Sequence, residues 1–321
     1  MHYFRKSVYT ILDLILAPVV LLFAPLAVVL SRLRDRAPLS RSVCDRFQFA
    51  IVRHHYYEPI VYANDLKRDL DRPREVAGLD LNEAAQLELV EQFNYRDELL
   101  KIPTLQKGPS EFGYHNGSFE PGDAEFLYNM IRHFRPKRIV EVGSGNSTLM
   151  ARLAIEANRT DNPGYECKQI CIEPFEQPWL ESARVTVLRK KVECCPDSLF
   201  ETLDENDILF IDSSHIIRPQ GDVLHEYLHV LGLLRPSVIV HVHDVFTPHD
   251  YPAQWLLRDR WLWNEQYLLE AFLSFNAHFE IIGAVNWLAR YHSNRLNNAC
   301  PVLMREPWRQ PGSFWFRRVQ K

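Results

Sequence analysis

Residues 138–148, with the sequence RIVEVGSGNST, decide the fold of this chain. The stretch is typical of a buried β-strand that runs into a glycine turn, with the carboxylate of Glu141 near the strand's end. Gly143 and Gly145 lack the Cβ atoms that would block a positive φ or a ligand lying close to the backbone. The stretch therefore predicts a strand–turn–helix unit that binds a nucleotide-type ligand.

Two later segments have the same form, each a short apolar run with a carboxylate at its C-terminal end. The first, QICIE, ends at Glu173, and the second, DILFID, ends at Asp212. Open α/β sheets bind their ligands beyond this end of the strands. Predicted strands and helices alternate along this part of the chain, which indicates a parallel sheet.

We predict an α/β fold, a Rossmann-like, doubly wound and mostly parallel seven-stranded sheet. Its predicted strands cover 138–142, 168–172, 185–189, 207–211, 237–243, 279–282 and 313–319. The last of these alternates as an antiparallel edge strand would. Helices are predicted between the strands, at about 147–157, 178–182, 197–203 and 220–233.

The composition is that of a globular protein, with 321 residues, 46% of them hydrophobic and 24% charged. The net charge of −4 gives no bulk positive field, so nucleic acid is not an expected partner. The six cysteines include no CxxC pair, which argues against a zinc ribbon or finger. Reduced thiols in a cytosolic domain are the simpler interpretation.

The N-terminus differs from the rest of the chain. Residues 11–30 are nearly all apolar, interrupted by Asp13, Pro18 and Pro25. Twenty residues can span a bilayer core, although the two prolines could instead bend the segment into a re-entrant hairpin. The run is long for a signal peptide and is followed by arginines. We expect a membrane anchor over 1–36, a connector with a helical extension over 37–116, and the α/β domain over 117–321.

The glycine turn departs from the dinucleotide-binding fingerprint. That fingerprint needs a third glycine and an acid about 20 residues further on. Here Thr148 holds the third position, and Glu173 comes 28 residues after Gly145. The turn is better suited to a nucleoside that carries a short charged tail.

With these residues, the segment resembles the class I S-adenosylmethionine-dependent methyltransferases over about residues 117 to 321. The resemblance implies S-adenosyl-L-methionine as cofactor, with Glu141 near the methionine moiety and Glu173 accepting hydrogen bonds from the ribose hydroxyls. The implied cofactor-binding residues are Glu141, Gly143, Ser144, Gly145, Glu173 and Glu193. Glu193 falls where the adenine edge usually lies, and an exposed charge is the alternative for it.

A second group of polar residues follows strands four and five. Asp212 ends one strand, and His243 and Asp244 end the next, so their side chains should converge beside the cofactor. Two carboxylates and a histidine can bind a hard divalent cation. The group resembles the metal-dependent O-methyltransferases, which implies Asp212, His243 and Asp244 as candidate ligands of Mg2+ or another divalent cation. His243 stands where that resemblance expects an oxygen ligand.

His215 lies three residues after Asp212, and the resemblance implies that it acts as general base beside a catalytic Asp212. Methyl transfer to a hydroxyl requires removal of its proton, and a base with a pKa near 7 can take it. The alternative is that His215 only braces the turn after strand four. The loop over 246–263 carries Tyr251, Trp255, Trp261 and Trp263, which could form an aromatic lid or simply pack.

The sequence thus predicts a membrane-associated methyltransferase whose catalytic domain faces the cytoplasm, where its cofactor is found. The expected acceptor is a hydroxyl of a small molecule, a glycan or a lipid-linked compound. Two alternatives stay open at this point: a nucleotide-dependent oxidoreductase, and a non-catalytic, membrane-tethered binding protein with the same fold. The acceptor's identity and the oligomeric state are not encoded in any motif.

Overall fold

The computed structural model describes residues 2–33, 36–175 and 177–320, with side chains from residue 8 onwards. The chain divides into two compact units. The smaller unit comprises Met1–Arg68 and Gln254–Leu262, and the larger comprises Asp69–Ala253 and Trp263–Lys321. Residues 69–116 therefore pack with the α/β domain, whereas the sequence-based division grouped them with a connector.

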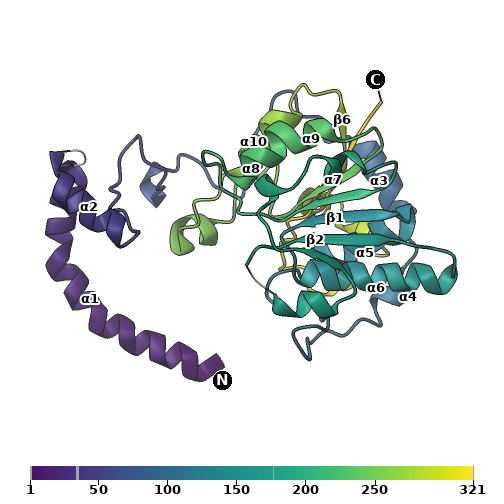
Figure 1. Ribbon diagram of the computed structural model, residues 1–321, viewed down its shortest axis with the longest axis horizontal. Helices are drawn as coiled ribbons and strands as arrows, with labels where there is room; N and C mark the ends of the chain where they lie inside the picture. Colours follow the sequence, from purple (N-terminus) through teal and green to yellow (C-terminus); the bar gives the residue numbers. More distant parts are fainter. Residues whose placement is uncertain (1, 34–35, 176, 321) are drawn as a thin grey trace. The chain divides into compact units, whose positions relative to one another are not determined.

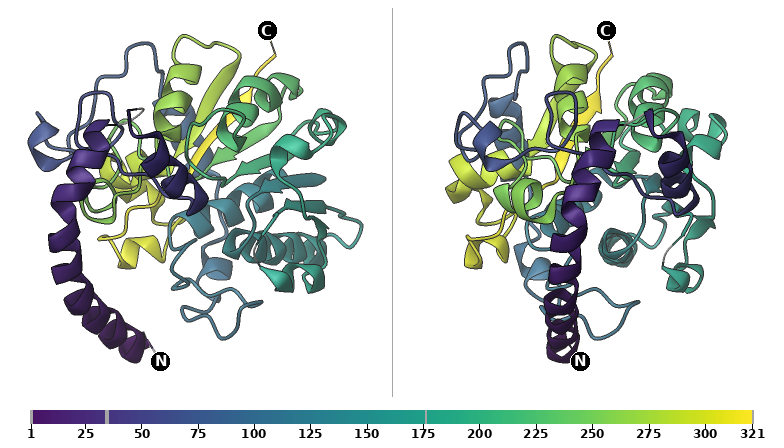
Figure 2. Two further views of the ribbon diagram at one scale, coloured as in Figure 1. Left: turned by 60° about the vertical axis from the view of Figure 1, so that its left-hand side comes forward. Right: turned by 90° about the vertical axis from the view of Figure 1, so that its left-hand side faces the viewer.

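The smaller unit is mostly helical. It contains α1 (His2–Leu33), α2 (Pro38–Arg46), the 3-10 helix η2 (Ala63–Asp65) and the π-helical η6 (Gln254–Asp259). Helix α1 continues through Pro18 and Pro25 and is curved along its length (Figures 1 and 2). Prolines within a helix commonly bend it. The described part of α1 contains no hairpin turn.

The segment Val8–Leu33 of α1 is long and apolar enough to cross a membrane, by length and composition. Only 6% of its most apolar stretch is buried, so it is not a core helix of the described structure. A signal sequence near an N-terminus meets the same two criteria.

The larger unit is built on a seven-stranded sheet in the order β3-β2-β1-β4-β5-β7-β6. Its strands are β1 (Arg138–Val142), β2 (Lys168–Ile172), β3 (Thr186–Leu188), β4 (Ile208–Ile211), β5 (Ile239–Val242), β6 (Phe279–Ala284) and β7 (Phe314–Arg318). The first five strands are parallel, and β7 is antiparallel to both of its neighbours. The predicted mostly parallel, seven-stranded fold is confirmed.

The prediction of an edge position for the last strand is wrong. Strand β7 lies between β5 and β6, and the edge on this side is formed by β6. Phe314, Trp315 and Phe316 are all buried, which a strand covered on both faces requires. Three consecutive aromatic residues fit such a doubly buried strand better than they fit alternation.

Helices cover both faces of the sheet (Figure 1). Helices α5 (Asp123–Phe134) and α6 (Asn146–Asp161) pack against each other on one face. On the other face lie α8 (Asp222–His225), the π-helical η5 (Glu226–Val230), α9 (Leu231–Leu233) and α10 (Glu265–Leu273). The remaining short helices are α3 (Glu83–Glu91), α4 (Arg96–Leu99), η3 (Pro178–Ser182), η4 (Val192–Cys194), α7 (Ser198–Glu201), α11 (Val285–Tyr291), η7 (Ser293–Leu296) and η8 (Leu303–Arg305).

The central strands form the core of the larger unit. All four residues of β4 and all four of β5 are buried, as expected for parallel strands with helices on both faces. Burying an isoleucine or leucine side chain such as Ile208 or Leu209 stabilises the fold by roughly 1.5–3 kcal/mol. These strands are therefore rigid supports for the polar residues at their ends.

Candidate active site

The glycine turn after β1 is held against the end of β4. Gly143 adopts a φ of +76°, and a Cβ there would lie 1.9 Å from the carbonyl oxygen of Asp212. The backbone N–H of Asp212 donates to the carbonyl of Val142 at 2.9 Å. Only glycine fits this close approach, so the turn fixes Asp212 next to the end of β1.

Glu141 lies behind this turn. Its buried carboxylate accepts hydrogen bonds from the hydroxyls of Ser147 (2.5 Å) and Thr148 (2.7 Å), in the first turn of α6. Burial raises the pKa of Glu141 to about 7, although these hydrogen bonds favour its charged form. Because both carboxylate oxygens are engaged by α6, we expect Glu141 to support the cofactor turn indirectly, and its predicted cofactor contact stays a prediction.

Glu173, at the end of β2, faces the same turn from the other side. Its carboxylate accepts from the backbone N–H of Ser144 at 3.2 Å and from that of Phe175 at 3.0 Å. These contacts hold the carboxylate in one orientation. Through the first of these hydrogen bonds, Ser144 contacts Glu173, the residue predicted to bind the ribose. Gly145 lies at the start of α6, where its N–H donates to the hydroxyl of Thr148.

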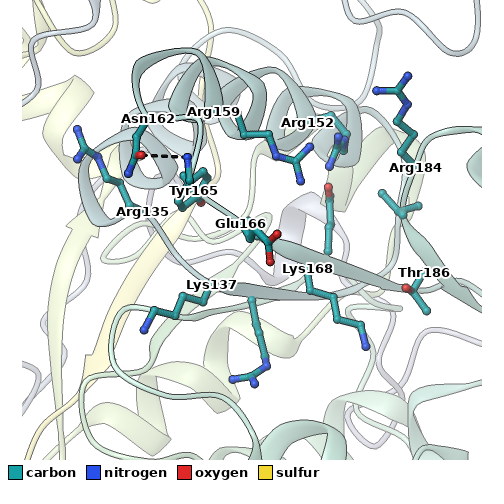
Figure 3. A pocket seen from close by; sticks show the side chains of 15 residues that line it. Arg135, Lys137, Arg152, Arg159, Asn162, Tyr165, Glu166, Lys168, Arg184 and Thr186 are labelled. Atoms are coloured by element: carbon teal, nitrogen blue, oxygen red, sulfur yellow. Dashed lines mark hydrogen bonds between the residues drawn. The ribbon is translucent and has the colours of Figure 1, made fainter.

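A cavity of about 250 Å³ opens at the C-terminal ends of β1, β2 and β4. Four of the predicted residues line it: Gly143, Glu173, Glu193 and Asp212. Glu141, Ser144 and Gly145 are not among the lining residues. A larger cavity lies at the opposite, N-terminal edge of the sheet (Figure 3) and contains none of these carboxylates.

The lining of the smaller cavity fits a nucleoside. Val142, Ile172 and Val192 provide apolar walls for a base, and Glu173 stands beside them as an acceptor for hydroxyl groups. Phe175, Lys191, Arg218 and Asp222 also line the cavity and were not predicted. Phe175, Lys191 and Arg218 lie in loops and Asp222 begins α8, and the sequence carries no periodic signal that places these side chains in the cavity.

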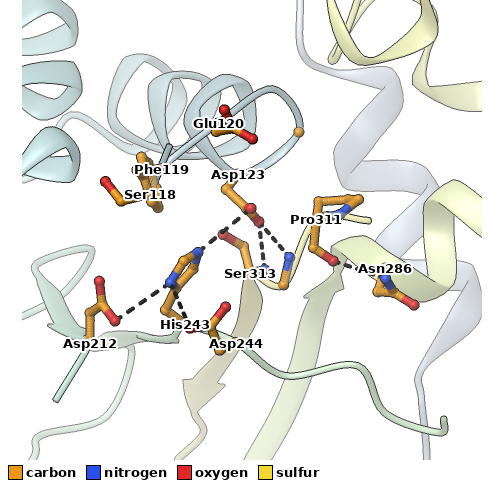
Figure 4. A network of polar contacts seen from close by, with 12 residues as sticks. Ser118, Phe119, Glu120, Asp123, Asp212, His243, Asp244, Asn286, Pro311 and Ser313 are labelled. Carbon is orange, nitrogen blue, oxygen red and sulfur yellow. Dashed lines mark hydrogen bonds and ion pairs between the residues drawn. The ribbon is translucent and has the colours of Figure 1, made fainter. Parts of the chain in front are cut away.

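Next to this cavity, two imidazoles face two carboxylates. His215 Nε2 lies 3.3 Å from Asp212 Oδ1 and 3.5 Å from Asp244 Oδ2. His243 Nδ1 lies 3.5 Å from the same Asp212 oxygen and 3.6 Å from the same Asp244 oxygen. Figure 4 shows His243 between Asp212, Asp244 and the helical residue Asp123. The predicted convergence of the strand-four and strand-five residues is therefore present in the structure.

Each imidazole also contacts a further buried carboxylate that the sequence did not reveal. Nδ1 of His215 lies 2.8 Å from Oε2 of Glu265, at the start of α10. Nε2 of His243 lies 3.6 Å from Oδ2 of Asp123, at the start of α5. Asp123 is itself fixed by the backbone N–H groups of Gly312 and Ser313. Carboxylates behind histidines in this way select the tautomer and the ring orientation.

The backbone brings His215 and Glu265 together. His215 has a φ of +59°, an uncommon conformation for a residue with a side chain, and such residues cluster at functional sites. Its carbonyl accepts the N–H groups of Asn264 (3.0 Å) and Glu265 (3.2 Å). The indole of Trp263 packs on the imidazole with ring centroids 4.4 Å apart. These contacts show that His215 braces the turn after β4, as the alternative to a catalytic role expected. Its Nε2 nevertheless faces Asp212 and Asp244.

Opposite charges offset the burial of His215, His243 and Asp212, whereas burial and the charges of Asp212 and Asp123 raise the pKa of Asp244. Burial opposes protonation of His215, yet its hydrogen bonds to Asp212 and Glu265 raise its pKa well above the usual value. Burial likewise opposes protonation of His243, and the charges of Asp244 and Asp212 raise the pKa of that imidazole. Burial also opposes ionisation of Asp212, but the charge of His243 and the hydrogen bond from His215 lower its pKa.

The structure offers two histidines as possible ligands of a cation, and the predicted set with His243 stays a prediction. Among the described residues, the group whose potential ligand atoms all lie within 4.8 Å of one another is Asp212, His215 and Asp244. The prediction placed His243 in this set in place of His215. Both histidines approach the same two carboxylate oxygens, so sequence order alone could not separate them.

The predicted aromatic lid is divided between the two units. Trp255 and Trp261 belong to the smaller unit, where their ring centroids lie 4.9 Å apart. Tyr251 and Trp263 belong to the larger unit. Tyr251 is buried, and its hydroxyl accepts from the N–H of Gln266 at 3.0 Å. Tyr251 therefore packs inside the larger unit, which agrees with the alternative that these aromatic residues simply pack.

Comparison with known proteins identifies a domain in this part of the chain. A family model described as a methyltransferase domain matches residues 140–245. An uncharacterized protein of Archaeoglobus fulgidus is 30% identical over 167 residues, which cover 48% of this chain and 74% of that protein. The solved structure of a "putative methyltransferase" from Thermobifida fusca YX is 14% identical, with a TM-score of 0.40, over 64% of this chain and 85% of the other.

The matched domain contains the end of β1, the glycine turn, Glu173 and the Asp212–Asp244 region, and the surrounding sheet is mostly parallel and seven-stranded, as predicted. The chain belongs to the class I S-adenosylmethionine-dependent methyltransferase family. This assignment replaces the oxidoreductase alternative, and S-adenosylmethionine is the methyl donor that the family implies.

Proposed function

We propose that this protein transfers a methyl group from S-adenosylmethionine to a hydroxyl, with His215 as general base. One observation carries the proposal: the Nε2 of a buried imidazole faces Asp212 beside the cofactor cavity, while its Nδ1 contacts Glu265. A histidine whose Nδ1 is fixed by one carboxylate and whose Nε2 faces two others is arranged to hold a proton that it takes from an acceptor.

The raised pKa of His215 means that the ring has to lose its Nε2 proton before it can act as a base. Glu265 then accepts the Nδ1 proton of the neutral ring, which leaves the lone pair on Nε2. When bound, S-adenosylmethionine supplies an electrophilic methyl group. As the acceptor oxygen forms its bond to the methyl carbon and the carbon–sulfur bond breaks, the hydroxyl proton passes to Nε2. Asp212 and Asp244 then stabilise the imidazolium. Glu265 contributes to the rate indirectly, because it holds the His215 ring in line with the reacting atoms.

The residues also fit a divalent cation, because two carboxylates and an imidazole backed by Asp123 form a suitable donor set. In this proposal Asp212, His243 and Asp244 hold the ion, which would lower the pKa of the acceptor hydroxyl. His215 cannot serve as both ligand and base, because its Nδ1 is engaged by Glu265 and only Nε2 faces the cluster.

Electron paramagnetic resonance of bound Mn2+ separates these roles. If His215 is the base, His215→Asn should retain Mn2+ binding and Asp212→Asn should lose it. If His215 is a ligand, both variants should lose binding. Turnover that survives complete chelation would remove the cation from the proposal and leave His215 as the base.

The reaction itself is tested with S-adenosylmethionine carrying a deuterated methyl group. Full-length protein is incubated with glycan and lipid extracts, and the products are analysed by mass spectrometry. We expect deuteromethyl ethers, which survive mild alkali, and their loss with His215→Asn. Label found only on nitrogen, carbon or alkali-labile esters would contradict transfer to a hydroxyl.

We further propose that α1 attaches the enzyme to a membrane, with the catalytic domain on the cytoplasmic side. The length and apolar composition of Val8–Leu33 support this proposal. A lipid-linked or membrane-made glycan acceptor would follow from that location. A truncation after Arg36 should methylate such an acceptor more slowly than the full chain; equal rates without detergent would argue against a membrane acceptor.

A further inference from the structure

A second cavity lies at the opposite edge of the same sheet. It has a volume of about 840 Å³ and opens where β1, β2 and β3 begin, beneath helix α6 (Figure 3). Strands rise by roughly 3.3 Å per residue, so the five residues of β1 separate this edge from the cofactor cavity by about 15 Å. A ligand in this cavity would not touch the reacting atoms.

The lining is strongly basic. Seven of its fifteen residues are lysine or arginine, and the one acidic lining residue is Glu166. The chain as a whole carries a net charge of −4, so this local excess of cations runs against its overall balance. Asn162 and Thr186 add neutral polar groups to the wall.

Arg152 and Arg159 project from α6 toward the strands below (Figure 3). Arg152 is partly buried, and among the described residues no carboxylate lies within ion-pair distance of its guanidinium. Arg159 approaches Glu156 at 3.6 Å, but that carboxylate is 61% exposed. Burial lowers the pKa of Arg152, and the charge of Arg159 lowers it further.

Such an arrangement costs free energy in the protein alone. The partly buried guanidinium of Arg152 is repelled by Arg159 and loses hydration without gaining an ion pair. The C-terminal edge compensates each histidine with buried carboxylates, whereas at this edge Arg159 reaches only the exposed Glu156. Of the other cavity cations, Arg138 lies 3.6 Å from the buried Asp207. An external anion would supply the missing charge. Guanidinium groups present paired N–H donors that match phosphate oxygens.

We propose that this cavity binds a phosphate-bearing ligand whose oxygens contact Arg152, Arg159 and Arg184. The shared chemistry is a phosphate mono- or diester or a diphosphate. Its source is either a soluble phosphate compound or the headgroup of an anionic lipid. The site is separate from methyl transfer, and its occupancy does not depend on the proposed reaction.

The proposal is tested by calorimetric titration of the full-length protein with inorganic pyrophosphate in a neutral detergent. We expect saturable binding, and a loss of affinity on the order of 10-fold or more in Arg152→Gln/Arg159→Gln, as for lost charged hydrogen bonds. Arg184→Gln, at an exposed position, provides an independent variant. Arg235→Gln is the control, because Arg235 is 55% exposed and lies outside the cavity.

The two sources are distinguished in lipid nanodiscs at an ionic strength of about 0.15 M, where the Debye length is about 8 Å. If a lipid headgroup occupies the cavity, phosphatidylglycerol discs should weaken pyrophosphate binding relative to phosphatidylcholine discs. Equal affinity in both assigns a soluble phosphate compound. The site is overturned if pyrophosphate does not saturate, or if the cavity variants bind it as well as Arg235→Gln does.

Discussion

The two edges of the central sheet differ in how their charges are balanced. At the C-terminal edge, His215 and His243 each contact two aspartates and one further carboxylate. At the N-terminal edge, lysines and arginines surround a larger cavity with Glu166 as the acidic lining residue. The histidines follow β4 and β5, whereas the basic cavity lies where β1, β2 and β3 of the same sheet begin.

This difference separates two kinds of site. Charges that are compensated within the protein are held in fixed positions before a ligand arrives, which suits chemistry that depends on alignment. Cations with few carboxylates around them gain most from an anion that comes from outside. The C-terminal edge is accordingly the site of the proposed reaction, and the N-terminal edge is a site for binding alone.

The largest expected effect comes from removing the proposed base. His215→Asn should lower kcat by roughly 100- to 10,000-fold, because general-base catalysis contributes about that much. Binding of S-adenosylmethionine should be nearly unchanged. His229→Asn is the matched control, since that histidine is 45% exposed and contacts Asp197. A His215→Asn enzyme with ordinary turnover would show that the imidazole only braces the loop.

Replacing Glu141 tests whether the buried acid supports the turn. Its folded-state pKa of about 7 exceeds the usual 4.5, so its contribution to stability is complete below pH 4.5 and is lost as pH rises through 7. The free energy of unfolding of Glu141→Gln should therefore fall less as the pH rises, by up to about 3 kcal/mol, than that of the wild-type protein. Urea unfolding between pH 5 and 9 measures the difference between the two proteins.

Glu125 has a similarly raised pKa of about 7, caused by burial, and it is retained in both proteins. Its contribution therefore cancels in the comparison. Identical pH dependence of the wild-type protein and Glu141→Gln would contradict the raised pKa of Glu141.

Glu173 should contribute to cofactor affinity directly. Glu173→Ala should weaken S-adenosylmethionine binding by roughly 1–3 kcal/mol, as for the loss of a charged hydrogen-bond partner. Calorimetry measures this change. Glu166→Ala removes a carboxylate from the opposite edge and should leave that affinity unaltered. Equal effects of the two substitutions would abolish the distinction between the edges.

The smallest effect is expected for Glu265, which acts through His215. Glu265→Gln retains the size of the side chain but weakens the acceptor for the Nδ1 proton. We expect kcat to fall about 10-fold, in line with one weakened hydrogen bond, with KM unchanged. The pH–rate profile should also shift. A variant that only loses stability, with its pH profile intact, would assign Glu265 a structural role.

Local pattern predicted much of the fold. Strands β1 and β2 have the predicted bounds, because apolar runs and glycine turns are local signals. The insertion of β7 between β5 and β6 depends on pairing between distant segments, which periodicity does not encode. The packing of residues 69–116 with the α/β domain likewise depends on contacts between distant segments.

The site was predicted unevenly. Glu173 and Asp212 line the cavity, because the ends of parallel strands meet at one edge of the sheet. Glu265 lies 50 residues from His215 in the sequence, and only the packing of α10 brings them together. The basic cavity has no local sequence signal, because its cations are dispersed over residues 135–184, where they resemble ordinary surface charges.

A crystal structure of the full chain with S-adenosylhomocysteine and Mn2+ would decide between the two edges. The nucleoside should occupy the C-terminal cavity, with its ribose hydroxyls on Glu173, and anomalous signal from Mn2+ should lie between Asp212 and Asp244. A nucleoside bound elsewhere, with Glu173 left free of it, would contradict the assignment of the reaction to this edge.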